Sequence, residues 1–128
     1  MCKCILRLNT NVGDQREEGV FFARRSTENG RYVFQFSTAD AVFFVTVGQN
    51  AALRREGEIS YSFPLDETHT AESQLHTPYG VIPVRVRTRK KEVCESDGEL
   101  FFSAEYDLIY EEYVQNCAMR FTAKPLKY

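Results

Sequence analysis

The sequence predicts an all-β protein, folded as an antiparallel up-and-down barrel of roughly eight to ten strands. Apolar and polar residues alternate with period two along most of the chain, which is the pattern of strands with one buried face. Turn residues such as Asn29-Gly30 interrupt this alternation at short intervals. Ten Phe and seven Tyr, with no Trp, favour the pleated surface of a sheet.

The composition is that of one globular domain covering residues 1–128. A hydrophobic content of 43% and a charged content of 27% are ordinary for such a domain, and the length suffices for a core. No apolar run approaches the ~20 residues of a membrane helix, and Met1-Cys2-Lys3-Cys4 leads into alternation rather than into a signal peptide. We therefore expect a cytoplasmic protein with no membrane partner. The net charge of −2 predicts no nucleic-acid partner.

The first half of the chain reads as a series of short hairpins. Residues 2–9 and 16–27 form the first two strands, and Asn29-Gly30 supplies a type I′ turn that sets Glu28 opposite Arg31. Residues 41–47 are apolar on both faces except Thr46, which predicts a strand covered on both sides. Shorter strands are expected around residues 51–55 and 59–63.

The second half contains the longest alternating stretch, introduced by a β-turn over residues 77–80 with Pro at its second position. Pro83 lies inside this stretch and has no N–H, so pairing must break or bulge on one side of it. A loop over residues 94–98 returns the chain. The predicted cross-strand pairs are Leu75–Ile82, Glu72–Arg85, Val86–Tyr106, Arg85–Asp107, Arg87–Glu105 and, about a turn at Glu111-Glu112, Phe102–Phe121.

These hairpins agree on one apolar face and one charged face. The agreement is informative because a slip of one residue would exchange the two faces. So many strands in a chain of this length must close on themselves, since open edges invite aggregation. A closed barrel is therefore the predicted architecture.

Several short motifs resemble those of the YwiB-like family of uncharacterised bacterial proteins. They are residues 53–57 (Leu-Arg-Arg-Glu-Gly), the 77–80 turn before a strand that ends in Thr88, and Gly98-Glu99-Leu100 leading to Tyr106-Asp107-Leu108. The resemblance covers roughly residues 42 to 123 of the chain, by matching its turns to those of barrel strands. It implies a lipocalin-like (calycin-type) β-barrel and a cytoplasmic location. It brings no established activity and no catalytic residues.

The most conspicuous charged feature is a basic row on the long strand. Arg85, Arg87, Arg89 and Lys91 share one face of a regular strand and could bind phosphate or a polyanion. The predicted carboxylate neighbours favour a structural reading instead, with cross-strand ion pairs that stabilise the sheet. The remaining candidates for anion binding are Arg89, Lys90 and Lys91.

Catalytic and metal-binding signals are weak. The four cysteines are expected to be free thiols in a reducing compartment, with two disulfides as the alternative. Cys2 and Cys4 could meet Cys117 around a metal, but structural zinc usually has four ligands at recognisable spacings. His69 and His76 have opposite parity, and their spacing is not a zinc signature. We predict no catalytic residue, no metal and no cofactor, and leave the Asp66-Glu67-His69 segment as the place where acid–base chemistry could be assembled.

The aromatic inner face is the remaining candidate site. Barrels of about eight strands either fill their interior with side chains or hold one small ligand. The predicted ligand-binding residues are Tyr32, Phe34, Phe36, Tyr61, Phe63, Phe102 and Tyr106. The sequence thus favours a barrel that binds a small apolar or amphipathic molecule. The alternatives are an interaction or structural barrel with a filled interior and, least supported, an enzyme. No oligomeric state is predicted.

Overall fold

The computed structural model describes residues 2–126, and these form ten strands and no helix. The described residues therefore contain no helix that is long and apolar enough to cross a membrane. The strands are β1 (Cys2–Val12), β2 (Gln15–Glu28), β3 (Arg31–Ser37), β4 (Ala41–Val47), β5 (Ala52–Gly57), β6 (Ser60–Pro64), β7 (Ala71–Thr77), β8 (Gly80–Ser96), β9 (Glu99–Ile109) and β10 (Val114–Pro125).

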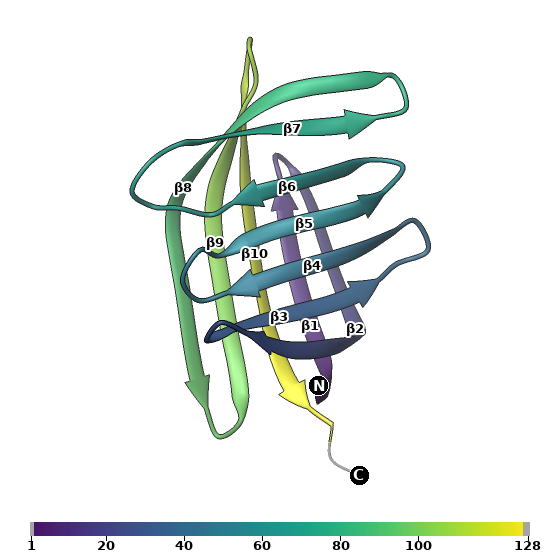
Figure 1. Cartoon of the computed structure of the whole chain (residues 1–128), viewed down its shortest axis with the longest axis vertical. Helices are drawn as coiled ribbons and strands as arrows, with labels where there is room; N and C mark the ends of the chain where they lie inside the picture. Colours follow the sequence, from purple (N-terminus) through teal and green to yellow (C-terminus); the bar gives the residue numbers. More distant parts are fainter. Residues whose placement is uncertain (1, 127–128) are drawn as a thin grey trace.

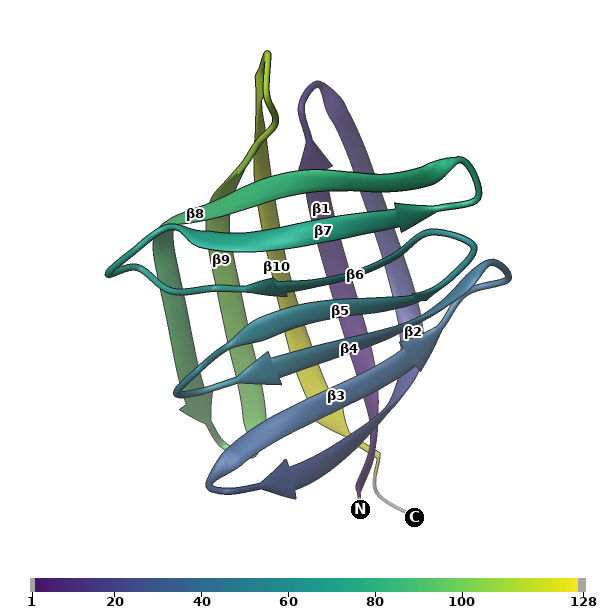
Figure 2. The same ribbon diagram turned by 45° about the horizontal axis from the view of Figure 1, so that its top comes forward.

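The strands close into the predicted up-and-down antiparallel barrel. Each strand pairs with its neighbours in the sequence, and β1 pairs with β10 to complete the ring. Figures 1 and 2 show β3 to β7 running across the molecule, while β1, β9 and β10 run steeply behind them. The all-β class and the strand number expected from the alternation are both confirmed.

Two long strands, β2 and β8, form the corners between these two layers. β2 pairs with β1 over residues 15–25 and with β3 over residues 24–28. β8 pairs with β7 over residues 80–86 and with β9 over residues 85–96. Pro83 therefore lies where β8 has a partner on one side only, as its missing N–H requires. A strand that changes partner along its length is how orthogonally packed sheets turn a corner.

The β8–β9 register differs from the prediction because the chain turns later than expected, and a β-bulge in β8 corrects part of the difference. The turn after β8 is a tight one with Asp97 and Gly98 at positive φ, and it sets Ser96 opposite Glu99. The register then shifts between Thr88 and Lys90. As a result Val86 lies opposite Leu108 rather than Tyr106. Arg85 lies opposite Ile109, and Arg87 opposite Asp107.

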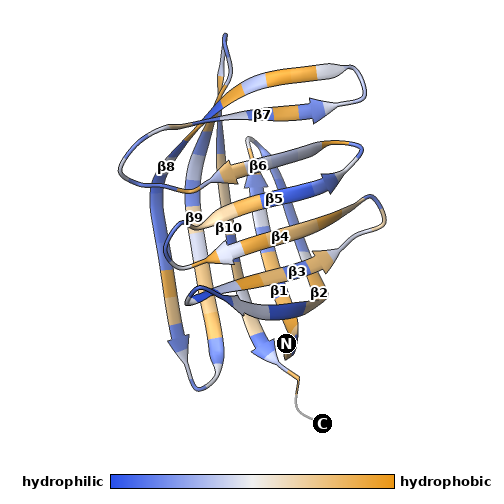
Figure 3. Cartoon of the chain, viewed as in Figure 1, coloured by the Kyte–Doolittle hydropathy of each residue, from blue (hydrophilic) through white to orange (hydrophobic). Residues whose placement is uncertain are grey.

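The other predicted hairpins are confirmed. Glu28 lies opposite Arg31, about a turn in which Asn29 (φ 51°) and Gly30 (φ 77°) both take positive φ. The pairs Leu75–Ile82, Glu72–Arg85 and Phe102–Phe121 are also found. Figure 3 shows the hydropathy colours changing repeatedly along the strands, which reflects the alternation that specified these registers.

The centre of the barrel is filled by aromatic side chains. Phe34 on β3 packs edge-on against Phe121 on β10, with ring centroids 5.2 Å apart. Phe121 also contacts Phe102 on β9 at 5.5 Å, and all three side chains are about 1% exposed. These contacts join the two layers, so the middle of the interior is a packed core.

The prediction that residues 41–47 are covered on both sides is wrong. Ala41, Val45 and Val47 are buried, but Val42 and Phe44 on the outer face are only half-buried. No second layer lies over them within the described residues. Instead the Arg54 guanidinium lies 3.9 Å from the centroid of the Phe44 ring and covers it. An arginine side chain therefore shields the exposed phenylalanine.

Candidate functional site: a groove at the mouth of the barrel

The barrel wall splits between β6 and β7. These strands pair at Ser60–His76 and Tyr61–Leu75 and then diverge. Beyond the pairs, the Ser73 hydroxyl donates a hydrogen bond to the Ser62 carbonyl at 2.6 Å, so a side chain replaces the ladder there. The six residues between β6 and β7, 65–70, let the two strands separate. This split opens one end of the barrel to the outside.

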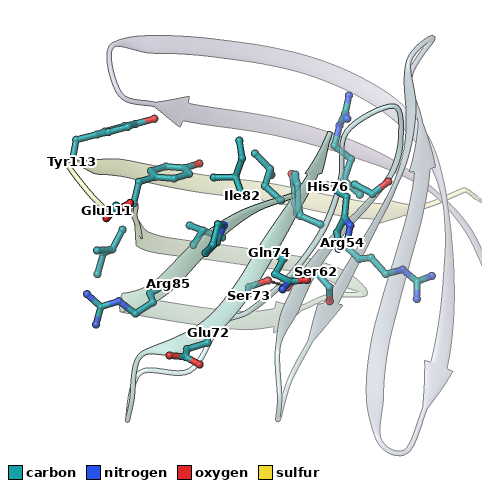
Figure 4. Close-up of a pocket in the computed structure, with 18 of the residues that line it drawn as sticks. Arg54, Ser62, Glu72, Ser73, Gln74, His76, Ile82, Arg85, Glu111 and Tyr113 are labelled. Atoms are coloured by element: carbon teal, nitrogen blue, oxygen red, sulfur yellow. Dashed lines mark hydrogen bonds between the residues drawn. The ribbon is translucent and has the colours of Figure 1, made fainter. Parts of the chain in front are cut away.

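A groove of about 1540 Å³ occupies the split and the adjoining mouth. One wall comes from β5 to β8 and the other from the tip that joins β9 to β10, as Figure 4 shows for Ile82, Glu111 and Tyr113. At that tip the Tyr110 and Tyr113 rings stack with centroids 4.8 Å apart. The Tyr110 N–H donates to the Tyr113 carbonyl at 2.9 Å, which holds the tip as a tight turn.

The floor of the groove is apolar and continuous with the core. Tyr61, Leu75 and Tyr110 line the groove and also pack against the buried cluster. Tyr61 stacks on Phe63 with ring centroids 4.1 Å apart, which fixes its ring. Ile82 at the rim is 42% exposed. An apolar group could therefore be buried here without moving the core.

Arg55 places a positive charge on the inner side of this groove. It lies opposite Phe43 and Tyr61 in the β-sheet register, and both of these side chains pack against the core. Its guanidinium donates to the Ile59 carbonyl and lies 5.6 Å from the Phe43 ring centroid. Among residues 2–126, no carboxylate lies within ion-pair distance of Arg55. An inward-facing arginine without a carboxylate can bind an anionic group.

Comparison with known proteins identifies the family. Residues 28–121 match the family described as Domain of unknown function (DUF1934). The chain belongs to this family. It also resembles the crystal structure of the YwiB protein from Bacillus subtilis, with a TM-score of 0.83 and 11% identity, over 98% of this chain and 93% of that one. No curated protein matches. The resemblance to the YwiB-like family and its closed barrel is thereby confirmed, and at this identity the match shows the fold alone.

The predicted ligand-binding residues all face the interior, but most of them lie away from the groove. Phe34, Phe36, Phe63, Phe102 and Tyr106 are buried, and Tyr32 and Tyr61 pack against the same cluster. Tyr61 is the member of this set that lines the groove. The role of these residues in binding stays a prediction. Of the aromatic face, the part nearest the groove is the end that carries Tyr61.

The three predicted anion-binding residues already have partners. Arg89 Nε donates to Asp107 Oδ1 at 3.1 Å, and Lys90 Nζ lies 3.2 Å from Glu92 Oε1. Lys91 Nζ donates to the Leu65 carbonyl at 3.0 Å. An added anion would have to compete with these contacts. The expectation that Lys91 shares a face with the arginines is wrong, because the bulge turns it toward the inner side, opposite Ala104.

The structural reading of the basic row holds, with different pairs from those predicted. Asp107 is 2% exposed although it lies on the outer face of β9. Arg87 donates to its Oδ2 through Nε at 3.1 Å and Nη2 at 2.9 Å, and Arg89 covers its other oxygen. The prediction had paired Asp107 with Arg85 and Glu105 with Arg87. The later turn and the bulge together move both carboxylates one arginine further along the strand, so Glu105 instead lies 3.9 Å from Arg89.

The remaining sequence signals do not converge on a second site. Asp66 accepts hydrogen bonds from Thr68 and lies 3.1 Å from His69 Nδ1 in the exposed β6–β7 loop, and none of the three lines the groove. The Thr68 hydrogen bonds lower the pKa of Asp66. All four cysteines are free thiols. Residues 2–126 contain no cluster of His, Cys, Asp or Glu suited to a metal ion.

Sequence reasoning missed Arg55, Leu75, Ile82 and the Tyr110–Tyr113 tip as groove residues. A signal for Arg55 was present, since it has the same parity as the buried Leu53 and therefore faces inward. The tip was not recognisable, because its position over the mouth depends on how far β9 and β10 extend beyond β7.

Proposed function

We propose that this protein is a small-molecule binding barrel of the lipocalin-like type, without catalytic activity. Its ligand is an amphipathic molecule with an apolar body and an anionic group. The observation that carries this proposal is the groove of about 1540 Å³ at the mouth. Ligand sites are usually concave and combine apolar surface with placed polar groups. This groove has an apolar floor and is bordered by charged and polar side chains of both signs.

The two halves of the ligand have separate counterparts. The apolar body lies over Tyr61, Leu75 and Tyr110, where it removes apolar surface from water. The anionic group binds Arg55, whose guanidinium has free donors beyond the one that bonds to the Ile59 carbonyl. The four free thiols, with Cys94 exposed, fit a reducing compartment and support a cytoplasmic location.

Two fluorescent probes with similar apolar bodies test the proposal. One is 1-anilinonaphthalene-8-sulfonate, which carries an anion, and the other is the uncharged N-phenyl-1-naphthylamine. Both should bind saturably at one site. Arg55→Gln should weaken the sulfonate by about 10-fold, the value of one hydrogen bond to a charged group, and leave the neutral probe unchanged. Ile82→Ser should weaken both, because it removes apolar area at the rim.

The matched control is Arg16→Gln, which removes a positive charge on the outer surface of β2, where it lies 3.2 Å from Glu18. It should leave both probes unaffected, and circular dichroism melting should show that every variant is folded. An absence of saturable binding by either probe would overturn the proposal. Equal loss of both probes in Arg55→Gln would show that the anionic group has no role.

The runner-up function is an interaction or structural barrel with a filled interior. The packed Phe34–Phe121–Phe102 centre favours it, because no ligand can enter there without displacing these rings. The two functions differ in whether the groove at the mouth binds a small molecule, so the probe titration distinguishes them.

A further inference from the structure

The outer face of β10, β1 and β2 carries a concentration of positive charge that the net charge of the chain conceals. Glu18 is the one outward carboxylate where β1 pairs with β2 and β10, and Glu28 lies at the far end of β2, opposite Arg31 on β3. The net charge of the whole chain is −2. The outward cations of these three strands are Lys3 and Arg7 on β1, Arg16 and Arg24 on β2, and Arg120 and Lys124 on β10.

Most of these cations are not neutralised. Arg16 pairs with Glu18 at 3.2 Å and Lys124 with Glu99 at 3.7 Å. Within residues 2–126, no carboxylate comes within 4.0 Å of Lys3, Arg7, Arg24 or Arg120. This contrasts with the arginines on β8, which share Asp107.

An exposed aromatic side chain lies in the middle of the charges. Phe22 is 80% exposed, and its strand neighbour Val20 is 63% exposed. In the register Phe22 lies opposite Ile5, with Lys3–Arg24 as the next outward pair on one side and Arg7–Val20 on the other. Phe22 and Val20 are neighbours on the same face of β2 with Ile5 beside them, and a contiguous exposed apolar patch rimmed by charges is a candidate interaction surface.

A hollow adjoins the ring. It measures about 250 Å³ and is lined by Lys3, Phe22, Ala23, Arg24 and Leu126. Leu126 is held in place because its N–H donates to the Lys3 carbonyl at 2.9 Å. The hollow shares no residue with the mouth groove. A small planar group could therefore lie against Phe22 with positive charge on two sides of it.

From these observations we propose that this face binds single-stranded nucleic acid. One base occupies the hollow against Phe22, and the flanking phosphates contact Lys3, Arg7, Arg24 and Lys124. Single-strand binding surfaces combine these two elements, an aromatic ring on which a base stacks and cations that follow the backbone. A single strand can turn a base toward the protein, whereas a duplex keeps its bases stacked inside.

Other occupants fit the face less well. A second copy of the chain, packed by two-fold symmetry, would bring these cations against each other. A bilayer would be reached by the longer Lys and Arg side chains before Phe22, because the ring lies in the middle of a strand rather than at a projecting tip. An acidic protein could satisfy the cations, but it would not explain a hollow beside an open aromatic ring.

Fluorescence anisotropy with fluorescein-labelled oligouridylate of twelve nucleotides tests the proposal on the full chain. Saturable binding should weaken with salt, with a slope of log K against log[salt] of about −3 for four phosphate contacts. Phe22→Ala should weaken binding about 5- to 100-fold, the usual range for losing one stacked base. Arg24→Gln should reduce the salt slope by about 0.7.

Two matched controls should change affinity less than about twofold, because neither lies on this face. They are Tyr79→Ala, a fully exposed aromatic on the β7–β8 turn, and Arg54→Gln, which removes a positive charge that lies 3.5 Å from Glu56 on β5. Because Phe22 is exposed, Phe22→Ala should fold normally, which circular dichroism melting checks.

Three results would overturn the proposal. One is no saturable binding at 50 mM salt. Another is unchanged affinity in Phe22→Ala while the cation variants weaken binding, which would indicate attraction by charge alone. The third is equal binding to polyglutamate or to phosphatidylglycerol vesicles, which would assign the face to an acidic protein or to a membrane.

Discussion

At the residue scale, three tyrosines and a cysteine at the groove end of the barrel are kept neutral by their surroundings. Burial is the main cause that raises the pKa of Tyr61 and Tyr110, and it raises the pKa of Tyr106 well above its ordinary value. Burial also raises the pKa of the Cys117 thiol to about 11, with the Asp107 carboxylate adding to the effect. A thiolate is therefore costly at this position, so Cys117 acts as a packing residue and not as a nucleophile.

Because these groups are buried in their neutral forms, the free energy of unfolding should fall at alkaline pH. The pKa of Cys117 rises from 9.0 to about 11 on folding, so its contribution is fully present below pH 9 and is lost between pH 9 and 11. Between pH 9 and 11 the free energy of unfolding should fall in both proteins. We expect the fall to be about 2 kcal/mol smaller in Cys117→Ala than in wild type. Urea denaturation at each pH measures the difference.

The control for this prediction is Cys94→Ala, which removes an exposed thiol and should behave like wild type. Tyr61, Tyr106 and Tyr110 are present in every variant, and the Cys117 thiolate raises the pKa of all three, so Cys117→Ala removes this coupling together with the thiol's own titration. Parallel pH profiles for wild type and Cys117→Ala would contradict the prediction.

At the element scale, the bulge in β8 determines the use of the whole basic stretch. Before the bulge Arg87 faces outward to Asp107, and after it Lys91 faces inward opposite Ala104. Lys91 then reaches the Leu65 carbonyl at 3.0 Å, and Glu95 accepts a hydrogen bond from the Tyr32 hydroxyl at 3.2 Å. These contacts close the gap between β8 and the ends of β6 and β3, where β8 has no strand partner except β9.

Deleting Arg89 should destabilise the protein about as much as truncating it. Arg89→Ala keeps the bulge and loses one hydrogen bond to Asp107, at a cost of about 1–2 kcal/mol. The deletion loses the same hydrogen bond and removes the extra residue, so Lys90 follows Thr88 in a regular ladder while Lys91 and Glu95 still face inward opposite Ala104 and Leu100. We expect the two variants to differ by less than about 1 kcal/mol.

Urea denaturation of the two variants measures this difference. Deletion of Glu67 in the exposed β6–β7 loop is the matched control, since loops tolerate changes in length. A deletion of Arg89 that costs more than about 2 kcal/mol beyond Arg89→Ala would contradict this and show that the bulge itself stabilises the sheet.

At the scale of the whole molecule, closure depends on aromatic contacts that cross the barrel. Phe121 on the last strand contacts Phe34 in the opposite layer and Phe102 beside it. Phe121→Ala should lower the free energy of unfolding by about 3–5 kcal/mol, because it leaves a cavity between the two layers. Phe22→Ala removes the same side chain from the surface and should cost less than about 0.5 kcal/mol. Thermal or urea unfolding of both variants measures the contrast, and similar losses would contradict the filled centre.

Local chemistry made much of this fold predictable from the sequence. Asn29-Gly30 specifies its turn through positive φ, and the parity of Tyr32, Phe34 and Phe36 specifies which face of β3 is buried. The β7–β8 and β9–β10 registers follow in the same way from alternation about a turn. The β8–β9 register was mispredicted because the chain was expected to reverse about the middle of residues 94–98, whereas the tight turn lies at Asp97-Gly98. Nothing in residues 88–90 marks the bulge that follows.

The candidate sites were less predictable than the strands. Alternation determined that Tyr61 and Arg55 face inward and that Phe22 and Arg24 face outward, because side-chain direction has a period of two. Only the tertiary structure decided that β6 and β7 separate to open the mouth, that the Tyr110–Tyr113 tip lies over it, and that six cations of three strands share one face. The physical reason is the distance along the sequence over which each feature is determined. Strand parity and turn geometry depend on neighbouring residues, whereas grooves and charged faces depend on which distant strands meet.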